Sequence, residues 1–174
     1  DESCTLEIGS GENFIKSAGS SASCTINGTL NTLSSDGFSA SGTGSDQALQ
    51  GFTSCSYGSS GTIDYARSNA QDITNQFSYN NLTLSNAGTK SAVGILDING
   101  NLTVESGVTM MLQSHTITFN GSSFDIDGSF DAGTGTVTFD GSQIQVITGN
   151  SSSLNFSNMI IDNTASGSND VQLN

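Results

Sequence analysis

The sequence predicts an all-β protein, and within that class a parallel β-solenoid (β-helix) of roughly eight short rungs. Apolar–polar alternation, glycine-based turn signals and the recurrence of similar segments predict it. The alternation has the period of two that a half-buried strand requires: in residues 116–119 (Thr-Ile-Thr-Phe) every second residue is apolar. No segment carries an apolar stripe of helical spacing long enough to predict a helix.

Turn residues separate the alternating segments. An aliphatic residue, Asn or Asp, Gly, a polar residue and a large apolar residue follow one another three times, at 26–30, 98–102 and 126–130. Asn-Gly and Asp-Gly favour tight turns because both residues tolerate a positive φ. The chain has 21 glycines and no proline, so we interpret the glycines as turns between strands rather than as disordered linkers.

Similar segments recur along the chain every 20 to 28 residues. Residues 116–119 match 136–139 at a spacing of 20, and residues 61–65 match 135–139 at a longer spacing of 74. The short spacings suit the coils of a parallel solenoid, in which similar residues stack at ~4.8 Å from coil to coil. An antiparallel β-sandwich is the alternative, which accounts for the alternation and the turns but not for the spacings.

The repeats favour residues 61–174 as the β-solenoid repeat region. Residues 1–60 match the repeats less well and contain all three cysteines, so we expect an N-terminal capping or junction region there. A chain of 174 residues suits a single core, and we expect the two regions to form one continuous domain.

Composition and charge favour a secreted protein, extracellular or on the cell surface. Three Lys and Arg against 16 Asp and Glu give a net charge of −13, which disfavours binding to nucleic acid and to anionic lipid. Only 11% of the residues are charged, so Ser, Thr, Asn and Gly supply most of the polar surface. No run of 18 apolar residues predicts membrane insertion, and the first residues, Asp1 to Cys4, resemble a processed terminus.

The three cysteines, Cys4, Cys24 and Cys55, lack the paired spacing of a zinc site. In an oxidising compartment we expect one disulfide and one odd thiol, and the sequence leaves the pairing open. The odd cysteine is a candidate for a bond to a neighbouring subunit. Three buried free thiols are the alternative.

Asp125, Asp127 and Asp131 form the pattern Asp-x-Asp-Gly-x-x-Asp and are the calcium candidate of the sequence. Calcium takes about six to eight oxygen ligands, and this pattern supplies part of such a set. Ile126, between the first two aspartates, fits a strand better than a calcium loop. A solvated turn is therefore the favoured alternative, and we predict no other cofactor.

We predict no catalytic residues and no enzymatic activity. His115 is the only histidine and lies in no recognisable nucleophile motif. The cations are limited to Lys16, Arg67 and Lys90, which makes a basic catalytic centre on a solenoid hard to assemble. Paired carboxylates keep a carbohydrate-binding or carbohydrate-cleaving β-helix as an alternative, although the chain has no Trp to line a groove.

Two further surface features carry hypotheses. Thr116 and Thr118, with Thr136 and Thr138, are expected outward pairs on neighbouring rungs, and they suggest an ice-binding solenoid as another alternative; threonine is also simply favoured in strands. Six Asn-x-Ser/Thr sequons are glycosylation candidates, although an Asn- and Ser-rich chain also makes such triplets by chance: Asn27, Asn81, Asn101, Asn120, Asn150 and Asn155.

Three neighbouring segments carry a resemblance to a known family: 133–142 (Gly-Thr-Gly-Thr-Val-Thr-Phe-Asp-Gly-Ser), 147–149 (Ile-Thr-Gly) and 155–163 (Asn-Phe-Ser-Asn-Met-Ile-Ile-Asp-Asn). Over about residues 61–174 the chain resembles the repeat region of large secreted bacterial surface proteins of the adhesin and haemagglutinin-like type. The resemblance implies a β-solenoid that decorates cells or forms fibres. The motif is low in complexity, so it indicates the fold better than the function.

We therefore expect an extracellular structural or adhesive β-solenoid subunit that stacks head to tail into a surface filament. The segment Asp170 to Asn174 has the pattern of a strand without a polar or helical cap, and a further rung would follow it naturally. We expect self-association, with cell-surface or polysaccharide contacts as further partners, and we expect neither nucleic-acid binding nor membrane insertion.

Overall fold

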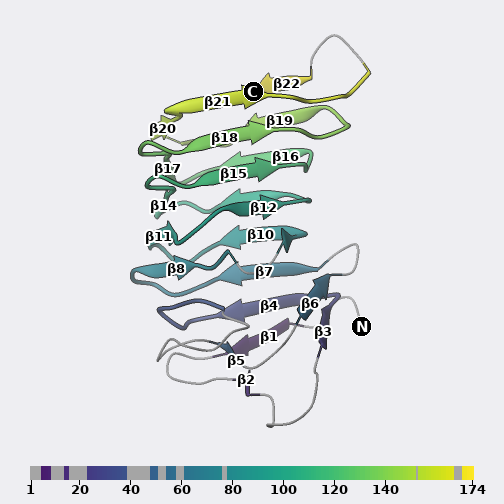
Figure 1. Cartoon of the computed structure of the whole chain (residues 1–174). Helices are drawn as coiled ribbons and strands as arrows, with labels where there is room; N and C mark the ends of the chain where they lie inside the picture. The colour runs from purple at the N-terminus through teal and green to yellow at the C-terminus, as the bar shows by residue number, and fades with distance from the viewer. Residues whose placement is uncertain are drawn as a thin grey trace.

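The computed structural model describes residues 5–8, 14–15, 23–38, 48–50, 54–57, 61–75, 78–151, 153–166 and 170–174. Every regular element in these residues is a β-strand, and the strands wind into the stacked coils that Figure 1 shows. All their pairings are parallel. The predicted parallel β-solenoid is confirmed. The antiparallel β-sandwich is wrong, because strands pair with strands one coil away rather than with their neighbours along the chain.

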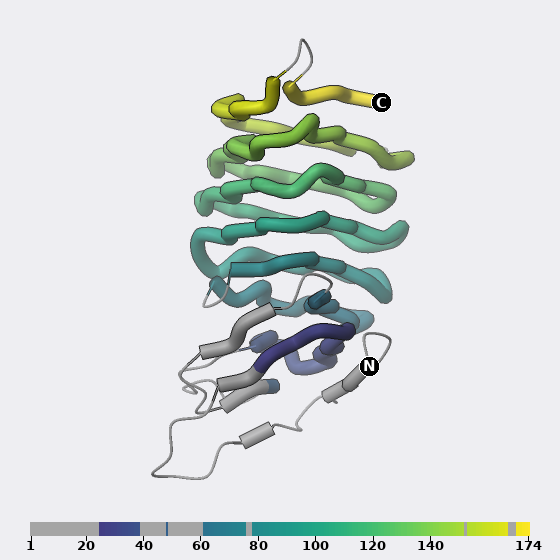
Figure 2. Tube along the Cα trace, turned by 90° about the vertical axis from the view of Figure 1, so that its right-hand side faces the viewer, coloured from purple at the N-terminus to yellow at the C-terminus, as the bar shows by residue number. Residues whose placement is uncertain are grey.

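Five coils are complete within the described residues, each with one strand on each of three sides. The chain visits what we call the long sheet, then the second sheet, then the third sheet, and returns to the long sheet of the next coil (Figures 1 and 2). The coils comprise β7 (Thr62–Tyr65), β8 (Gln71–Ile73) and β9 (Ser78–Tyr79); β10 (Asn81–Leu84), β11 (Gly88–Ala92) and β12 (Leu96–Ile98); β13 (Leu102–Val104), β14 (Val108–Met111) and β15 (Thr116–Phe119); β16 (Ser123–Ile126), β17 (Ser129–Asp131) and β18 (Thr136–Phe139); and β19 (Gln145–Thr148), β20 (Ser153–Asn155) and β21 (Asn158–Ile161).

The long sheet has eight strands, so one side of the solenoid has as many strands as the predicted number of rungs. Its order is β1-β4-β7-β10-β13-β16-β19-β22, with β1 (Thr5–Ile8), β4 (Thr29–Thr32) and β22 (Val171–Leu173) beyond the complete coils. The second sheet has the order β20-β17-β14-β11-β8 and the third β21-β18-β15-β12-β9. Because β4 pairs with β7, the long sheet continues across the predicted boundary between residues 60 and 61.

Two short strand pairs lie near the N-terminal end of the long sheet (Figure 1). β2 (Phe14–Ile15) pairs with β5 (Leu49–Gln50), and β3 (Ser23–Ile26) pairs with β6 (Ser54–Tyr57). Along the chain β3 precedes β4, and β6 precedes β7, which is the position that third-sheet strands take in the complete coils. The first coils thus keep the order of the solenoid but pair some strands outside its three main sheets.

The strand register shows which recurrences in the sequence are coil repeats. Thr116–Phe119 stacks residue for residue on Thr136–Phe139, as their spacing of 20 predicts. The 74-residue similarity is not a coil repeat, because Thr62–Tyr65 lies in the long sheet and its match lies in the third sheet. In the long sheet, successive register partners from Leu82 to Ile147 are 20, 22 and 23 residues apart, and 74 is not a multiple of such a coil.

The Asn/Asp-Gly motif serves two different corners. Asn27-Gly28 and Asn99-Gly100 lead into strands of the long sheet, whereas Asp127-Gly128 leads from the long sheet into the second sheet. Both corners need a tight turn between short strands, and the same residue types satisfy that need. The motif therefore marks a corner without identifying which corner it is.

The core consists of inward columns of side chains that run along the solenoid axis. In the long sheet Ile63, Leu82, Leu102, Phe124 and Ile147 form one such column, and each is at most 4% exposed. Burial of a side chain of this size stabilises the fold by about 1.5–3 kcal/mol. In the later coils, aromatic rings pack at centroid distances of 5.2–6.5 Å: Phe119, Phe124, Phe130, Phe139 and Phe156.

The corner from the third sheet into the long sheet needs glycine because the coils approach closely there. A Cβ on Gly121 would lie 1.6 Å from the carbonyl oxygen of Gly100 in the coil below. A Cβ on Gly100 would likewise lie 2.2 Å from the carbonyl oxygen of Asn80. Backbone atoms cannot yield as a flexible side chain can, so a larger residue at either position forces adjacent coils apart.

Replacing Gly121 by Ala should lower the free energy of unfolding by about 3 kcal/mol, since the methyl group overlaps the backbone of the adjacent coil. Gly107→Ala is the matched control. A Cβ there would meet nothing closer than 3.5 Å, so only the φ of 84° adds strain, of about 1 kcal/mol. Urea unfolding followed by circular dichroism measures both variants. Equal losses would contradict the steric role of Gly121.

Candidate functional site

A polar hollow of about 470 Å³ follows the corner between the third sheet and the long sheet. Its lining comes from the turns of successive coils and contains no charged or aromatic residue. Because each coil returns to the long sheet through a similar Asn- or Gly-containing turn, the turns place their side chains above one another. We call this surface the amide corner, after its main polar residues: Asn81, Asn99, Asn101, Asn120, Ser122 and Gln143.

Hydrogen bonds between coils order the amide corner. The Asn120 amide nitrogen donates to Asn99 Oδ1 at 3.0 Å, and the Asn101 backbone N–H donates to Asn81 Oδ1 at 2.9 Å. Asn101 Oδ1 in turn accepts from the backbone N–H of Ser123 at 3.2 Å. These bonds hold the amide planes in place, so the corner is a fixed polar surface rather than a set of mobile side chains.

Part of the hydrogen-bonding capacity of the amide corner remains open to solvent. Asn99 and Asn101 are exposed, and within the described residues their amide nitrogens donate no hydrogen bond. Such uncharged donors and acceptors, repeated from coil to coil, suit a neutral polyhydroxylated ligand. The sequence interpretation assigned these asparagines only to turns and sequons. The near-equal spacing of Asn81, Asn101 and Asn120 was the signal for a stacked amide surface.

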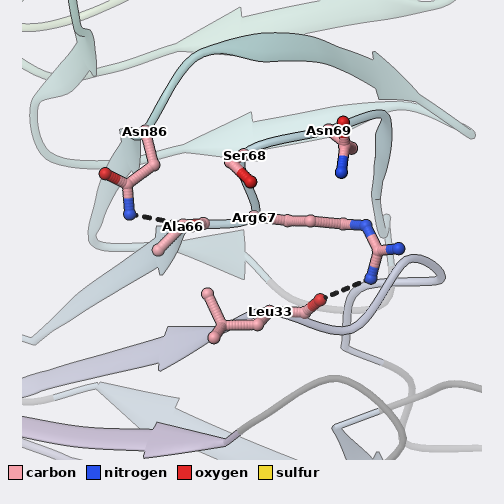
Figure 3. A pocket seen from close by; sticks show the side chains of 6 residues that line it. All are labelled: Leu33, Ala66, Arg67, Ser68, Asn69 and Asn86. Carbon is pink, nitrogen blue, oxygen red and sulfur yellow. Dashed lines mark hydrogen bonds between the residues drawn. The ribbon is translucent and has the colours of Figure 1, made fainter.

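A second hollow, of about 370 Å³, lies beside Arg67 and is drawn in Figure 3. The Arg67 guanidinium donates to the backbone oxygen of Leu33 at 2.9 Å, and the Asn86 amide donates to the backbone oxygen of Ala66 at 3.0 Å (Figure 3). The three coils that contribute these residues are thereby joined through side chain–backbone bonds. Arg67 is used in this structural contact, and we do not assign a ligand to this hollow.

Lys90 is a fully buried charged residue close to this second hollow. Its strand register places it on Gln71 of the preceding coil, and its Nζ donates to Gln71 Oε1 at 3.1 Å and to the backbone oxygen of Arg67. The Gln71 amide nitrogen donates to the backbone oxygens of Thr32 and Ser34, both at 2.9 Å. These bonds satisfy a polar cluster inside an otherwise apolar core.

Burial lowers the pKa of Lys90 to about 8, with the carboxylate of Asp64 opposing this shift and the Arg67 charge adding to it. An amine that titrates near neutral pH can act as a nucleophile, but this amine is shielded from solvent and therefore from a substrate. We assign Lys90 a structural role. The sequence signal was its position two residues before Ala92 in a strand, since alternate residues share a face.

The three candidate calcium ligands are spread along one coil, from β16 through the following turn into β17. Asp125, Asp127 and Asp131 each accept a side-chain hydrogen bond of 2.9–3.1 Å from the next coil, donated by Thr148, Asn150 and Asn155 in turn. In the part of the chain that the structure describes, no group of three or more His, Cys, Asp and Glu side chains is arranged to hold a metal ion. The structure thus gives these carboxylates a role in joining coils, and calcium binding stays a prediction.

Two other aspartates have raised pKa values. Burial raises the pKa of Asp140, and the charges of Asp97 and Asp162 raise it further. Burial and the charge of Asp36 raise the pKa of Asp72. A group with a raised pKa in the folded chain contributes stability at low pH, and this contribution is lost as the pH rises through the folded-state value. These two carboxyls therefore favour the folded chain in mild acid.

The sequons lie mainly at corners. Asn81, Asn101 and Asn120 belong to the amide corner, and Asn27 lies in the turn before β4. The side-chain nitrogens of four sequon asparagines already donate hydrogen bonds: Asn81, Asn120, Asn150 and Asn155. Glycosylation of the six asparagines stays a prediction.

The threonine pairs stack as predicted, but the array is two coils deep. Thr118 and Thr138 are register partners in the third sheet, and the same outward column continues as Asp97 on one side and Ile160 on the other. A carboxylate and a large apolar side chain interrupt the hydroxyl pattern. His115 lies in the turn before β15, outside the threonine column.

The two remaining observations concern cysteines and relatives. Cys24 and Cys55 are partners in the β3–β6 pair, and Cys4 lies outside the described residues. No helix in the described ranges is long and apolar enough to span a membrane. Comparisons with protein-family models, curated proteins and solved structures found no match to this chain.

Stability should rise with pH between about 8 and 9.5 by about 1–2 kcal/mol, because the unfolded chain holds a proton that buried Lys90 has released. Lys90→Met should remove this rise. Urea unfolding at pH 8 and 9.5 measures the effect, and staying below pH 10 avoids the titration of unfolded tyrosines, since burial raises the pKa of Tyr65 in the folded chain. A wild-type profile identical to that of the variant would contradict the assignment.

Proposed function

We propose that this chain is an extracellular structural β-solenoid subunit of the adhesin type, which stacks head to tail into a filament. The observation that supports the proposal is an apolar end surface made by β20, β21 and β22, at the top of Figure 1. We call this surface the open end. The acidic composition, rich in uncharged polar residues, supports secretion to the cell exterior, where such a filament would contact surfaces or polysaccharides.

Core positions that are buried in the interior coils are exposed at the open end. Ile161 of β21 is the register partner of Phe139, yet it is 56% exposed while Phe139 is fully buried. Leu173 of β22 is 75% exposed, whereas its partner Ile147 is 4% exposed. Met159 of β21 adds a third apolar side chain, 41% exposed. Another coil placed on this surface would bury all three.

The open end also has strand edges without a partner strand. β20, β21 and β22 are the outermost strands of their sheets, and such edges direct backbone N–H and C=O groups toward a further strand. β1 is at the opposite end of the long sheet. A contact that joins β22 of one copy to β1 of the next is heterologous, and a contact of this kind propagates into a filament when it does not close into a ring.

Net charge sets the conditions for stacking. Each copy carries −13, so copies repel one another at low ionic strength. The screening length falls from about 30 Å at 0.01 M salt to about 8 Å at 0.15 M. Filaments held by apolar contacts and strand pairing should therefore form more readily as the salt concentration rises.

Ile161→Lys should raise the concentration needed for filament formation by about 10-fold or more, because it puts a charge where the next copy would bury an apolar side chain. Ile95→Lys is the matched control, since Ile95 is 61% exposed but lies at a corner on the side of the solenoid. Negative-stain electron microscopy and sedimentation velocity at 0.01 M and about 0.15 M salt measure the assembly.

Three outcomes would count against this proposal. A monomer at every protein and salt concentration would reject self-association of this chain. A closed dimer would indicate that two open ends meet, instead of one end meeting the opposite end of the next copy. Equal effects of the two lysine variants would show that net charge, not the open end, controls assembly.

A second candidate function is the binding of a neutral polysaccharide at the amide corner. The supporting observation is the uncharged hollow in which Asn99 and Asn101 direct unbonded amide nitrogens to solvent. The net charge of −13 disfavours acidic polysaccharides. Without an aromatic platform in the lining, binding would depend on hydrogen bonds and would be weak for a single short chain.

Titration with neutral hexasaccharides of glucose, mannose and N-acetylglucosamine should shift the NMR signals of the amide corner, and hexagalacturonate should not. Substituting Asn99 and Asn101 together by Ala should weaken binding about 10-fold, since two hydrogen bonds to the ligand are lost. Asn69→Ala, in the hollow beside Arg67, is the control and should bind normally. Shifts that spread evenly over all three sheets, or none at all, would reject the site.

A further inference from the structure

The β3–β6 strand pair brings two of the three cysteines together in the fold. Its register is parallel and pairs Ser23 with Ser54, Cys24 with Cys55, and Ile26 with Tyr57. Cys24 and Cys55 are 31 residues apart in the sequence, so only the return of the chain after a full coil makes them neighbours. The sequence alone left the choice among three cysteines open.

Neighbouring strands have the spacing that a disulfide needs. Backbones in adjacent strands are about 4.7–4.9 Å apart. A disulfide joins residues whose Cα atoms are about 4.4–6.8 Å apart. Residues that are register partners also lie on the same face of the pair. Cys24 and Cys55 therefore satisfy the backbone condition for a cross-link between adjacent coils.

Cys4 has no comparable placement opposite either of the other two cysteines. It precedes β1, whose first residue Thr5 pairs with Thr29 in the long sheet. The β3–β6 pair belongs to a separate two-stranded sheet. The strand order thus favours one of the three possible pairings.

We propose that Cys24 and Cys55 form a disulfide that staples two adjacent coils near the N-terminal end of the solenoid. The two thiols lose two protons and two electrons, and a small-molecule disulfide such as oxidised glutathione accepts them as it is reduced to two thiols by thiol–disulfide exchange. Cys4 remains a thiol. This proposal is independent of filament formation, because it concerns pairing within one chain.

The disulfide closes a loop that contains β4 and β5. β4 pairs with β1 on one side and β7 on the other, so the loop connects the first strands of the long sheet to the complete coils. The end coil of a solenoid has a neighbouring coil on one side only and opens more readily than an interior coil. A covalent link there limits the opening of the N-terminal coils, because it reduces the conformational freedom of the opened chain.

Alkylation followed by peptide mapping tests the pairing. After folding with oxidised and reduced glutathione, the unreduced denatured chain should take up one alkyl group, at Cys4, and the reduced chain three. Cys4→Ser should take up none before reduction. Reduction should lower the melting temperature by about 10 °C in wild type and in Cys4→Ser. It should have no such effect in the Cys24→Ser/Cys55→Ser double variant.

The outcomes separate the alternatives. Three alkylated cysteines in the unreduced chain would overturn the proposal, as would a mapped bond that includes Cys4. A Cys24–Cys55 bond with an unchanged melting temperature would keep the pairing but overturn the stapling role. If the double variant fails to fold, the mapping of wild type and of Cys4→Ser still decides the pairing.

Discussion

Parallel hydrogen bonding between successive coils is the constraint on which the rest of this structure depends. It fixes each residue opposite its counterpart one coil away, at the spacing of adjacent strands. Apolar residues at inward positions therefore become continuous columns such as the one through Leu82, Leu102 and Phe124. The same constraint gathers the turn asparagines into one surface and leaves no room for a side chain at Gly121.

The constraint also acts on polar residues in the core. Gln71 and Gln145 each begin a strand with an inward side chain and donate to two backbone oxygens of the preceding coil. A corner leaves carbonyl groups without strand partners, and a buried glutamine amide has two N–H groups with which to satisfy them. Lys90 extends this arrangement by one coil through Gln71. These buried polar groups complete the hydrogen bonding that the sheets leave unfinished.

The fold class followed from the alternation and the short spacings, and the stack of residues 116–119 on 136–139 was predictable residue by residue. The 74-residue similarity misled, because every side of the solenoid uses the same alternating strand and Asn/Asp-Gly turn. The amide corner and the inward Lys90 could not be assigned without knowing which side of the coil each strand occupies. Turn chemistry specifies that the chain bends, but coil length, which varies from turn to turn, decides what meets across coils.

Buried Lys90 has a consequence for how the chain avoids misfolding. Coils with similar strands offer alternative alignments in which a segment stacks one coil out of place, and these compete with the native alignment during folding. In a displaced alignment Lys90 would lose Gln71 and the carbonyl of Arg67 and would face aliphatic side chains instead. An unpaired buried amine costs several kcal/mol, by order of magnitude. One lysine thus distinguishes the correct alignment of these coils from nearly identical incorrect ones.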